Sequence, residues 1–101
     1  GVLTAKEIVR ERDLNGSFTS YLDFVRRCYK LGRDVLKNII LSGALDSFGK
    51  TRKTLIENLN DAINYADLCN DLDESLVLKP ELKEYDEYSK DELTPRMHPS
   101  D

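Results

Sequence analysis

The sequence is poor in residues that commonly carry chemistry. Its 101 residues include one histidine, no tryptophan and two cysteines, Cys28 and Cys69, which are far apart in the chain. His98 stands between Met97 and Pro99, without a neighbouring nucleophile or orienting carboxylate of the kind that a catalytic histidine needs. No C-x-x-C pair, Walker loop or dinucleotide fingerprint occurs either. We therefore expect no catalytic residue, no metal site and no cofactor, so that the chain is not an enzyme by itself.

Long apolar runs are missing as well. A helix needs roughly 18 mostly apolar residues to cross a bilayer, and no stretch of this sequence approaches that length. The first residues, GVLTAKEIVRER, are charged and have a helical pattern, which is unlike a signal peptide. These absences predict a cytoplasmic protein with two reduced thiols, although a disulfide between the cysteines stays open at this stage.

Charge is abundant and unevenly divided. Charged residues make up 34% of the sequence and hydrophobic residues 40%, which suits one small domain with a modest core. Residues 1–53 carry 11 cations and 6 anions, a net charge of +5, whereas residues 54–101 carry 4 cations and 13 anions, a net charge of −9. The total of −4 argues against a simple nucleic-acid binder, but the basic first half suits an anionic partner. Ordinary solvated faces explain the same charges, so charge alone does not decide the function.

Apolar residues recur at helical spacing in four segments. We expect helices over residues 4–13, from Ser20 to a break at Gly32, over 33–42 and over about 51–68. Thr4 has a glutamate three positions later, the spacing of a capping box, which predicts the start of the first helix there.

The expected fold class is therefore all-α, a small bundle of about four short helices followed by an extended acidic tail. We place the folded domain at residues 1–70. Residues 71–101 hold all three prolines and many acids, and are expected to be a flexible linker or tail.

The stretch LSGALDSFGKTRKTL, residues 41–55, contains the most distinctive turn. Gly43 is expected to end the third helix, because glycine tolerates the left-handed backbone of a helix C-terminus. Lys50, Arg52 and Lys53 then stand at the start of the fourth helix, where the helix dipole disfavours positive charge. A bound phosphate would reverse that cost, so these cations favour an anion contact over a plain joint between helices.

Several segments together resemble a known family. GVLTAKEIVRER looks like the second half of a helix-hairpin-helix element. GSFTSYLDFVRRC and RDVLKNIILSGALDSFG resemble the alpha (catalytic) subunit of bacterial DNA polymerase III. That family has a Gly-x-Phe-x-Ser segment, then a helix with an Asp-Phe pair and a basic end, and then a Ser-Gly-Ala-Leu/Phe-Asp-x-Leu/Phe-Gly run. The resemblance covers about residues 1–68, and EYSKDEL is similar to the stretch that follows in the family.

The resemblance implies a helix-hairpin-helix-type domain that binds double-stranded DNA without reading its sequence. Backbone amides, lysines and arginines would contact phosphates behind the primer terminus during DNA replication. The family is a DNA-directed DNA polymerase, a nucleotidyltransferase, whose catalytic aspartates lie in a palm domain that is not in this chain. The implied partners are duplex DNA, the remainder of the alpha subunit and, through adjacent regions, the sliding clamp. The implied location is the bacterial nucleoid, and the isolated chain is expected to be a monomer.

The candidate DNA contacts are the hairpin glycine and the cations of the first, third and fourth helices: Gly1, Lys6, Arg10, Arg33, Lys37, Lys50, Arg52 and Lys53. Arg26, Arg27 and Lys30 are further candidates. For each cation, a solvated position is as good an explanation as a phosphate contact. The alternative function is a structural or protein-interaction segment that packs on the polymerase core, leads toward clamp-binding elements and makes no DNA contact of its own.

Overall fold

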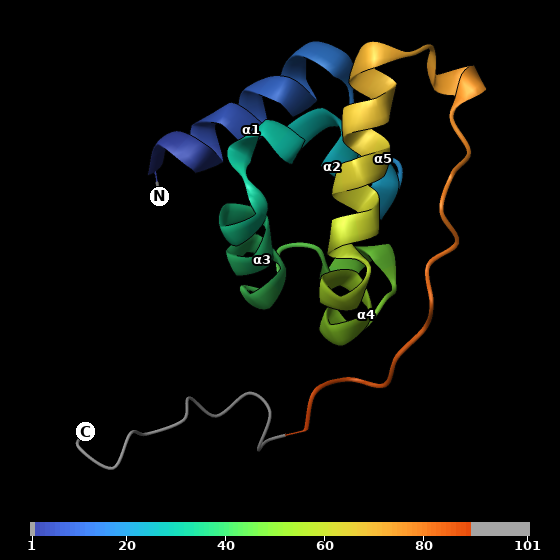
Figure 1. The fold of residues 1–101 in the computed structure, drawn as a ribbon. Coiled ribbons are helices and arrows are strands. Elements are labelled where there is room, and N and C mark those ends of the chain that lie inside the picture. The colour runs from blue at the N-terminus through green and yellow to red at the C-terminus, as the bar shows by residue number, and fades with distance from the viewer. Residues whose placement is uncertain (1, 90–101) are drawn as a thin grey trace, which may run out of the picture.

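A computed structural model describes residues 2–89 of the chain. This part contains five α-helices, followed by an extended segment (Figure 1). They are α1 (Val2–Asn15), α2 (Tyr21–Cys28), α3 (Arg33–Leu41), α4 (Arg52–Glu57) and α5 (Leu59–Asp71). Three short 3-10 turns lie between or after them, η1 (Tyr29–Leu31), η2 (Asp46–Phe48) and η3 (Glu74–Leu76). No strand occurs within residues 2–89, and the expected all-α fold class is confirmed. Gly1 and His98 lie outside the described residues.

Of the two predicted helix N-caps, the structure confirms the one at Ser20 but not the one at Thr4. Ser20 caps α2 as predicted, with an extended backbone and a hydroxyl that accepts the Asp23 N–H at 3.1 Å. The capping-box prediction at Thr4 is wrong, because α1 already begins at Val2 and Thr4 lies inside its first turn.

The fourth predicted helix is two helices. Asn58, with φ −99° and ψ 3°, separates α4 from α5. Its side-chain amide donates to the Thr54 carbonyl at 2.7 Å and to the Lys83 carbonyl at 2.9 Å. Asparagine competes for backbone hydrogen bonds in this way and so interrupts helices. The sequence pattern did not predict this break, because the apolar stripe continues across it from Leu55 to Leu59, both of which are fully buried.

The core forms where α2 packs along α5, with α3 and α4 closing one end of this pair and α1 crossing the other (Figure 1). Tyr21 ties α2 to α4, because its hydroxyl donates to the Leu55 carbonyl at 2.7 Å inside the core. Burial raises the pKa of this phenol. The buried core residues come from α2, α3, the turn after α3, α4 and α5: Tyr21, Phe24, Val25, Cys28, Leu36, Ile40, Leu45, Leu55, Leu59, Ala62 and Ala66.

Apolar packing alone does not position α1. Among the apolar residues Ala5, Ile8 and Val9 of α1, only Ile8 packs against the core, whereas Ala5 is exposed and Val9 is 42% exposed. The attachment of α1 to α2 is instead largely polar, and it centres on Arg27.

The guanidinium of Arg27 joins α1, the following loop and α2. It forms ion pairs with Glu11 at 2.9 Å and with Asp23 at 3.1 Å. It also donates to the carbonyl oxygens of Glu11 at 3.2 Å and Gly16 at 2.6 Å. The carbon of the guanidinium lies 4.3 Å from the ring centroid of Phe18, in cation–π contact. The Arg27 side chain is only 9% exposed as a result.

Both carboxylates of this cluster are held in their charged form. The hydrogen bond from Arg27 is the main cause that lowers the pKa of Glu11 below its ordinary value. For Asp23, partial burial raises the pKa, but hydrogen bonds from the Thr19 N–H, Arg26 and Arg27 outweigh it and leave the pKa lowered.

After η3 the chain runs back in an extended form beside the helices (orange in Figure 1). Leu76, at the end of η3, and Leu78 are 74% and 92% exposed. Leu82 packs against the core instead. The domain boundary near residue 70 stays a prediction.

Replacing Arg27 by alanine should destabilise the fold by about 2–3 kcal/mol, because it removes one charged donor from two carboxylates and from several carbonyls. Urea unfolding followed by circular dichroism measures this loss. Arg26→Ala is the matched control, since half-buried Arg26 pairs within the described residues with Asp23 at 2.8 Å and with Glu74 at 3.8 Å, and its loss is expected to cost about 1 kcal/mol. Equal losses in the two variants would contradict the central role of Arg27.

The contribution of Glu11 should depend on pH. Because its pKa is lowered in the folded state, its stabilising effect is present above the ordinary value of 4.5 and is lost as the pH falls through the folded-state value. Glu11→Gln should therefore lower the free energy of unfolding at pH 7 and make little difference at pH 3. Glu7→Gln removes a charge from the same helix and serves as the control. A pH-independent effect of Glu11→Gln would contradict the ion pair.

Candidate nucleic-acid interface

The turn between α3 and α4 brings Arg52 onto Asp46. Arg52 donates to both carboxylate oxygens of Asp46, from Nε at 3.2 Å and from Nη2 at 3.0 Å. Gly43 follows the end of α3 with φ +87°, and a Cβ there would lie 2.7 Å from the Arg52 Nη2. The positive φ favours glycine here, and a Cβ would also force the tip of the Arg52 side chain to shift. Arg52 closes the turn, and its hydrogen bond is the main cause that lowers the pKa of Asp46.

The start of α4 is covered by acidic residues from the extended segment. Thr51 caps α4 and accepts the Thr54 N–H at 3.0 Å. The carboxylate of Glu87 accepts the backbone N–H groups of Arg52 at 3.0 Å and Lys53 at 3.2 Å. These hydrogen bonds, that of Arg52 first, lower the pKa of Glu87.

The two lysines beside this cap also contact the segment. Lys50 forms an ion pair with Glu84. The ammonium of Lys53 lies 5.7 Å from the ring centroid of Tyr88. The structure thus brings together the three cations predicted near residue 50, and it surrounds them with Asp46, Glu84 and Glu87.

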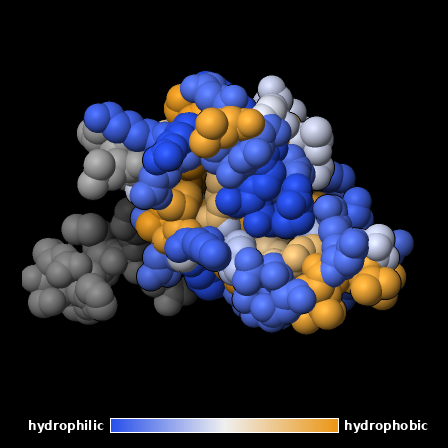
Figure 2. Space-filling model, turned by 90° about the horizontal axis from the view of Figure 1, so that it is seen from above, coloured by the Kyte–Doolittle hydropathy of each residue, from blue (hydrophilic) through white to orange (hydrophobic). Residues whose placement is uncertain are grey.

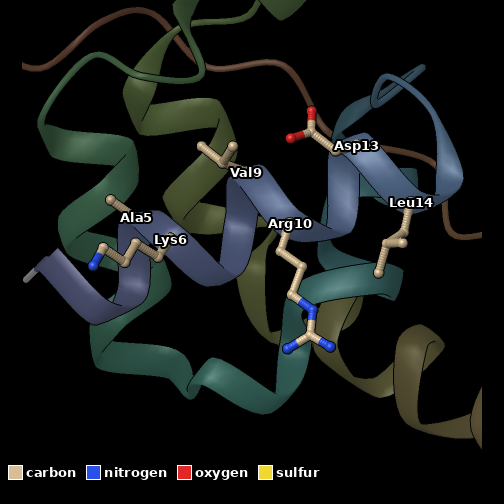
Figure 3. Close-up of a pocket in the computed structure, with 6 residues that line it drawn as sticks. All are labelled: Ala5, Lys6, Val9, Arg10, Asp13 and Leu14. Carbon is tan, nitrogen blue, oxygen red and sulfur yellow. The ribbon is translucent and has the colours of Figure 1, made fainter.

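On α1, Lys6 and Arg10 are exposed and make no hydrogen bond or ion pair within residues 2–89. They border a shallow apolar face with Ala5, Val9 and Leu14 (Figure 3). All of its lining residues come from α1, so this is an open helix face and not a cleft between elements. Viewed from above, the molecule is mostly hydrophilic with separate hydrophobic areas (Figure 2).

The two candidate DNA contacts on α3, Arg33 and Lys37, differ in whether they have a partner within the described residues. The guanidinium of Arg33 donates to Asn60 on α5 at 2.8 Å. Lys37 is half-buried and makes no hydrogen bond or ion pair within the described residues. Since α1 and α4 lie at opposite ends of the molecule in Figure 1, the candidate cations do not form a single cluster.

Sequence reasoning missed Glu84 and Glu87 as part of this region. Their acidic neighbourhood was visible, but their partners lie 34 and 35 positions earlier in the chain. No local pattern specifies such a register.

No arrangement for catalysis is seen in residues 2–89. Cys28 and Cys69 are free thiols, and burial is the main cause that raises the pKa of Cys28 to about 11, which keeps it protonated. No group of three His, Cys, Asp or Glu side chains in this part of the chain is placed to hold a metal ion. None of the described helices is both long and apolar enough to cross a membrane.

Comparison with known families identifies the region that holds most of these cations. A family model described as helix-hairpin-helix motif matches residues 1–55, which include α1, α2, α3 and the turn into α4. The chain belongs to the helix-hairpin-helix family.

Individual relatives of this helix-hairpin-helix chain are DNA polymerase III alpha subunits. The subunit from Staphylococcus epidermidis is 35% identical over 103 residues, covering 100% of this chain and 9% of that protein. The subunit from Staphylococcus aureus is 42% identical over 66 residues, covering 63% of this chain and 6% of that protein. The chain therefore spans less than a tenth of the length of these relatives. The search of solved structures gave no significant match.

The closed turn of this helix-hairpin-helix chain can be tested in solution. Arg52→Ala should raise the pKa of Asp46 toward its ordinary value of 3.8, because Arg52 is the main cause of its lowering. Titration of the Asp46 carboxyl by NMR measures this shift. Lys53→Ala removes a neighbouring cation that does not act on Asp46, and should leave that titration unchanged. An unaltered Asp46 titration in Arg52→Ala would show that the bidentate pair is not formed.

Proposed function

We propose that this chain is a double-stranded DNA-binding module of a DNA polymerase III alpha subunit and contacts phosphates without reading sequence. The observation that carries the proposal is the helix-hairpin-helix match over residues 1–55 in a chain similar to that subunit along its whole length. The net charge of +5 in residues 1–53 supports it. Nucleotidyl transfer belongs to parts of the polymerase outside this chain, and the module works in the cytoplasm, at the nucleoid.

The binding energy comes mainly from phosphate neutralisation. Each lysine or arginine that meets a phosphate releases a condensed counterion, which makes affinity fall steeply with salt. Among the candidate cations, Lys6, Arg10, Lys30 and Lys37 are available for this without breaking a hydrogen bond or ion pair inside the described residues. Arg33, Lys50, Arg52 and Lys53 are candidates that must first give up the partners described above. Gly1 would contribute its backbone amide.

Such contacts are few, so the isolated monomer should bind weakly. In the whole subunit, tethering to the catalytic core raises the effective concentration of the module at the duplex. Weak intrinsic affinity is therefore compatible with a role behind the primer terminus.

A second candidate function rests on the apolar part of α1. Val9 and Leu14 are 42% and 69% exposed on its outer face (Figure 3). This face would suit packing against the remainder of the subunit, with the acidic segment leading toward the sliding clamp. In that case the cations would pair with protein acids, and DNA would not be bound.

Fluorescence anisotropy with labelled duplex DNA over a salt series separates the two functions. Binding should weaken as salt rises, and Lys6→Ala with Arg10→Ala should reduce the slope of log affinity against log salt by about 2. The matched control is Lys79→Ala with Lys83→Ala, which removes two cations from the extended segment. No binding by the wild-type chain at low salt would favour the interaction role.

A further inference from the structure

Residues 82–88, here named the strap, bind the edge of α4 through their backbone. The Lys83 N–H donates to Asn58 Oδ1 at 3.1 Å, and the Lys83 carbonyl accepts from the same amide side chain at 2.9 Å. Two residues on, the Tyr85 N–H donates to Thr54 Oγ1 at 2.8 Å and the Tyr85 carbonyl accepts from it at 3.0 Å. Alternate strap residues are thus held by paired hydrogen bonds from α4 and the residue that follows it.

The two side chains that bind the strap, those of Thr54 and Asn58, are buried in the core. Thr54 is 0% exposed and Asn58 is 3% exposed, and both are bonded to the strap. Buried polar groups are costly without partners, so this contact is specific to the register observed. Leu82 adds apolar packing at the start of the strap.

The acidic side chains of the strap then reach the cations proposed to bind DNA. Glu84 pairs with Lys50, and Glu87 accepts from the backbone at Arg52 and Lys53. The side chains of Glu81 and Asp86, in contrast, are exposed and make no hydrogen bond or ion pair within the described residues. The strap therefore places two of its carboxylates at this basic surface and leaves neighbouring ones in solvent.

We propose that the strap is a built-in anionic competitor that must leave Lys50, Arg52 and Lys53 before DNA phosphates contact them. This inference rests on the proposed function. Exposed ion pairs are individually weak, but a tethered segment rebinds at high effective concentration. The strap therefore covers the surface in the free chain, while a duplex with many phosphates displaces it. DNA affinity is then limited by release of the strap.

The first test compares two double variants that remove the same charge. Glu84→Gln with Glu87→Gln should tighten binding to a labelled duplex about five-fold, because the competing carboxylates are lost. Glu81→Gln with Asp86→Asn removes two charges from the same segment and should change affinity much less. The gain should disappear when Lys50, Arg52 and Lys53 are replaced by alanine. Circular dichroism confirms that each variant is folded.

The second test observes the strap itself. Hydrogen exchange of the Lys83 and Tyr85 amides, followed by NMR, should become faster when excess duplex is added. The Ala62 amide, bonded to the Asn58 carbonyl at 3.0 Å, is the internal reference and should not change.

The outcomes distinguish failure of the competitor proposal from failure of the proposed DNA-binding function. If both double variants gain the same affinity for DNA, the change in net charge explains the effect, and the proposal that the strap competes with DNA is wrong. DNA binding that leaves the Tyr85 amide protected would also overturn it, with the DNA-binding function intact. If no variant binds duplex even at low salt, the proposed function fails and the competitor fails with it.

Discussion

The position of α1 depends on one guanidinium. Because Ile8 is the one side chain among residues 4–15 of α1 that packs against the core, burial of apolar surface in this part of the helix does not fix its angle or register on α2. Arg27 does so, since its planar fork of five N–H donors meets carboxylates and carbonyls on α1, on the loop and on α2. A lysine offers a single point charge and lacks this geometry. Because its donors are occupied by these contacts, Arg27 is not free to contact a phosphate, and it stabilises the fold instead.

Some parts of the fold that depend on neighbours in the chain were predictable from sequence, although the cap expected at Thr4 is not formed. Ser20 and Asp23 are three positions apart, and the cap they form follows from that spacing alone. The break at Asn58 was not predictable by periodicity, because the buried stripe continues through it. The candidate cations were recognisable by type and by family resemblance, but not their partners. Arg27 and Glu11 are 16 positions apart, and Lys50 and Glu84 are 34 apart, so their pairing appears only when the helices are packed.

The uneven charge of the chain has a structural consequence at α4. The basic first half and the acidic second half meet there, where Glu84 and Glu87 lie against the residues that follow Gly49. Counting charges by segment therefore overstates the number of free cations near residue 50. Neutralisation is local, however, and it leaves Lys6 and Arg10 on α1 without a partner in the described residues. An overall charge of −4 is thus compatible with cations on α1 that are unpaired among residues 2–89, because Glu84 and Glu87, which lie against the cations near residue 50, come from the extended segment.

The mixed character of the α1 face bears on the choice between DNA and a protein partner. Packing this face into a protein interface would desolvate Lys6 and Arg10, which is costly unless each meets an acid of matching geometry. A phosphate backbone supplies anions along its length and leaves the rest of each side chain in water. The apolar area offered by Val9 and Leu14 is that of two partly exposed side chains on one helix, whereas dedicated docking patches usually exceed roughly 300 Å². The lysine and arginine stems can lie over these residues while their charged ends reach outward. The physical cost of burial therefore favours a solvated, phosphate-facing role for α1.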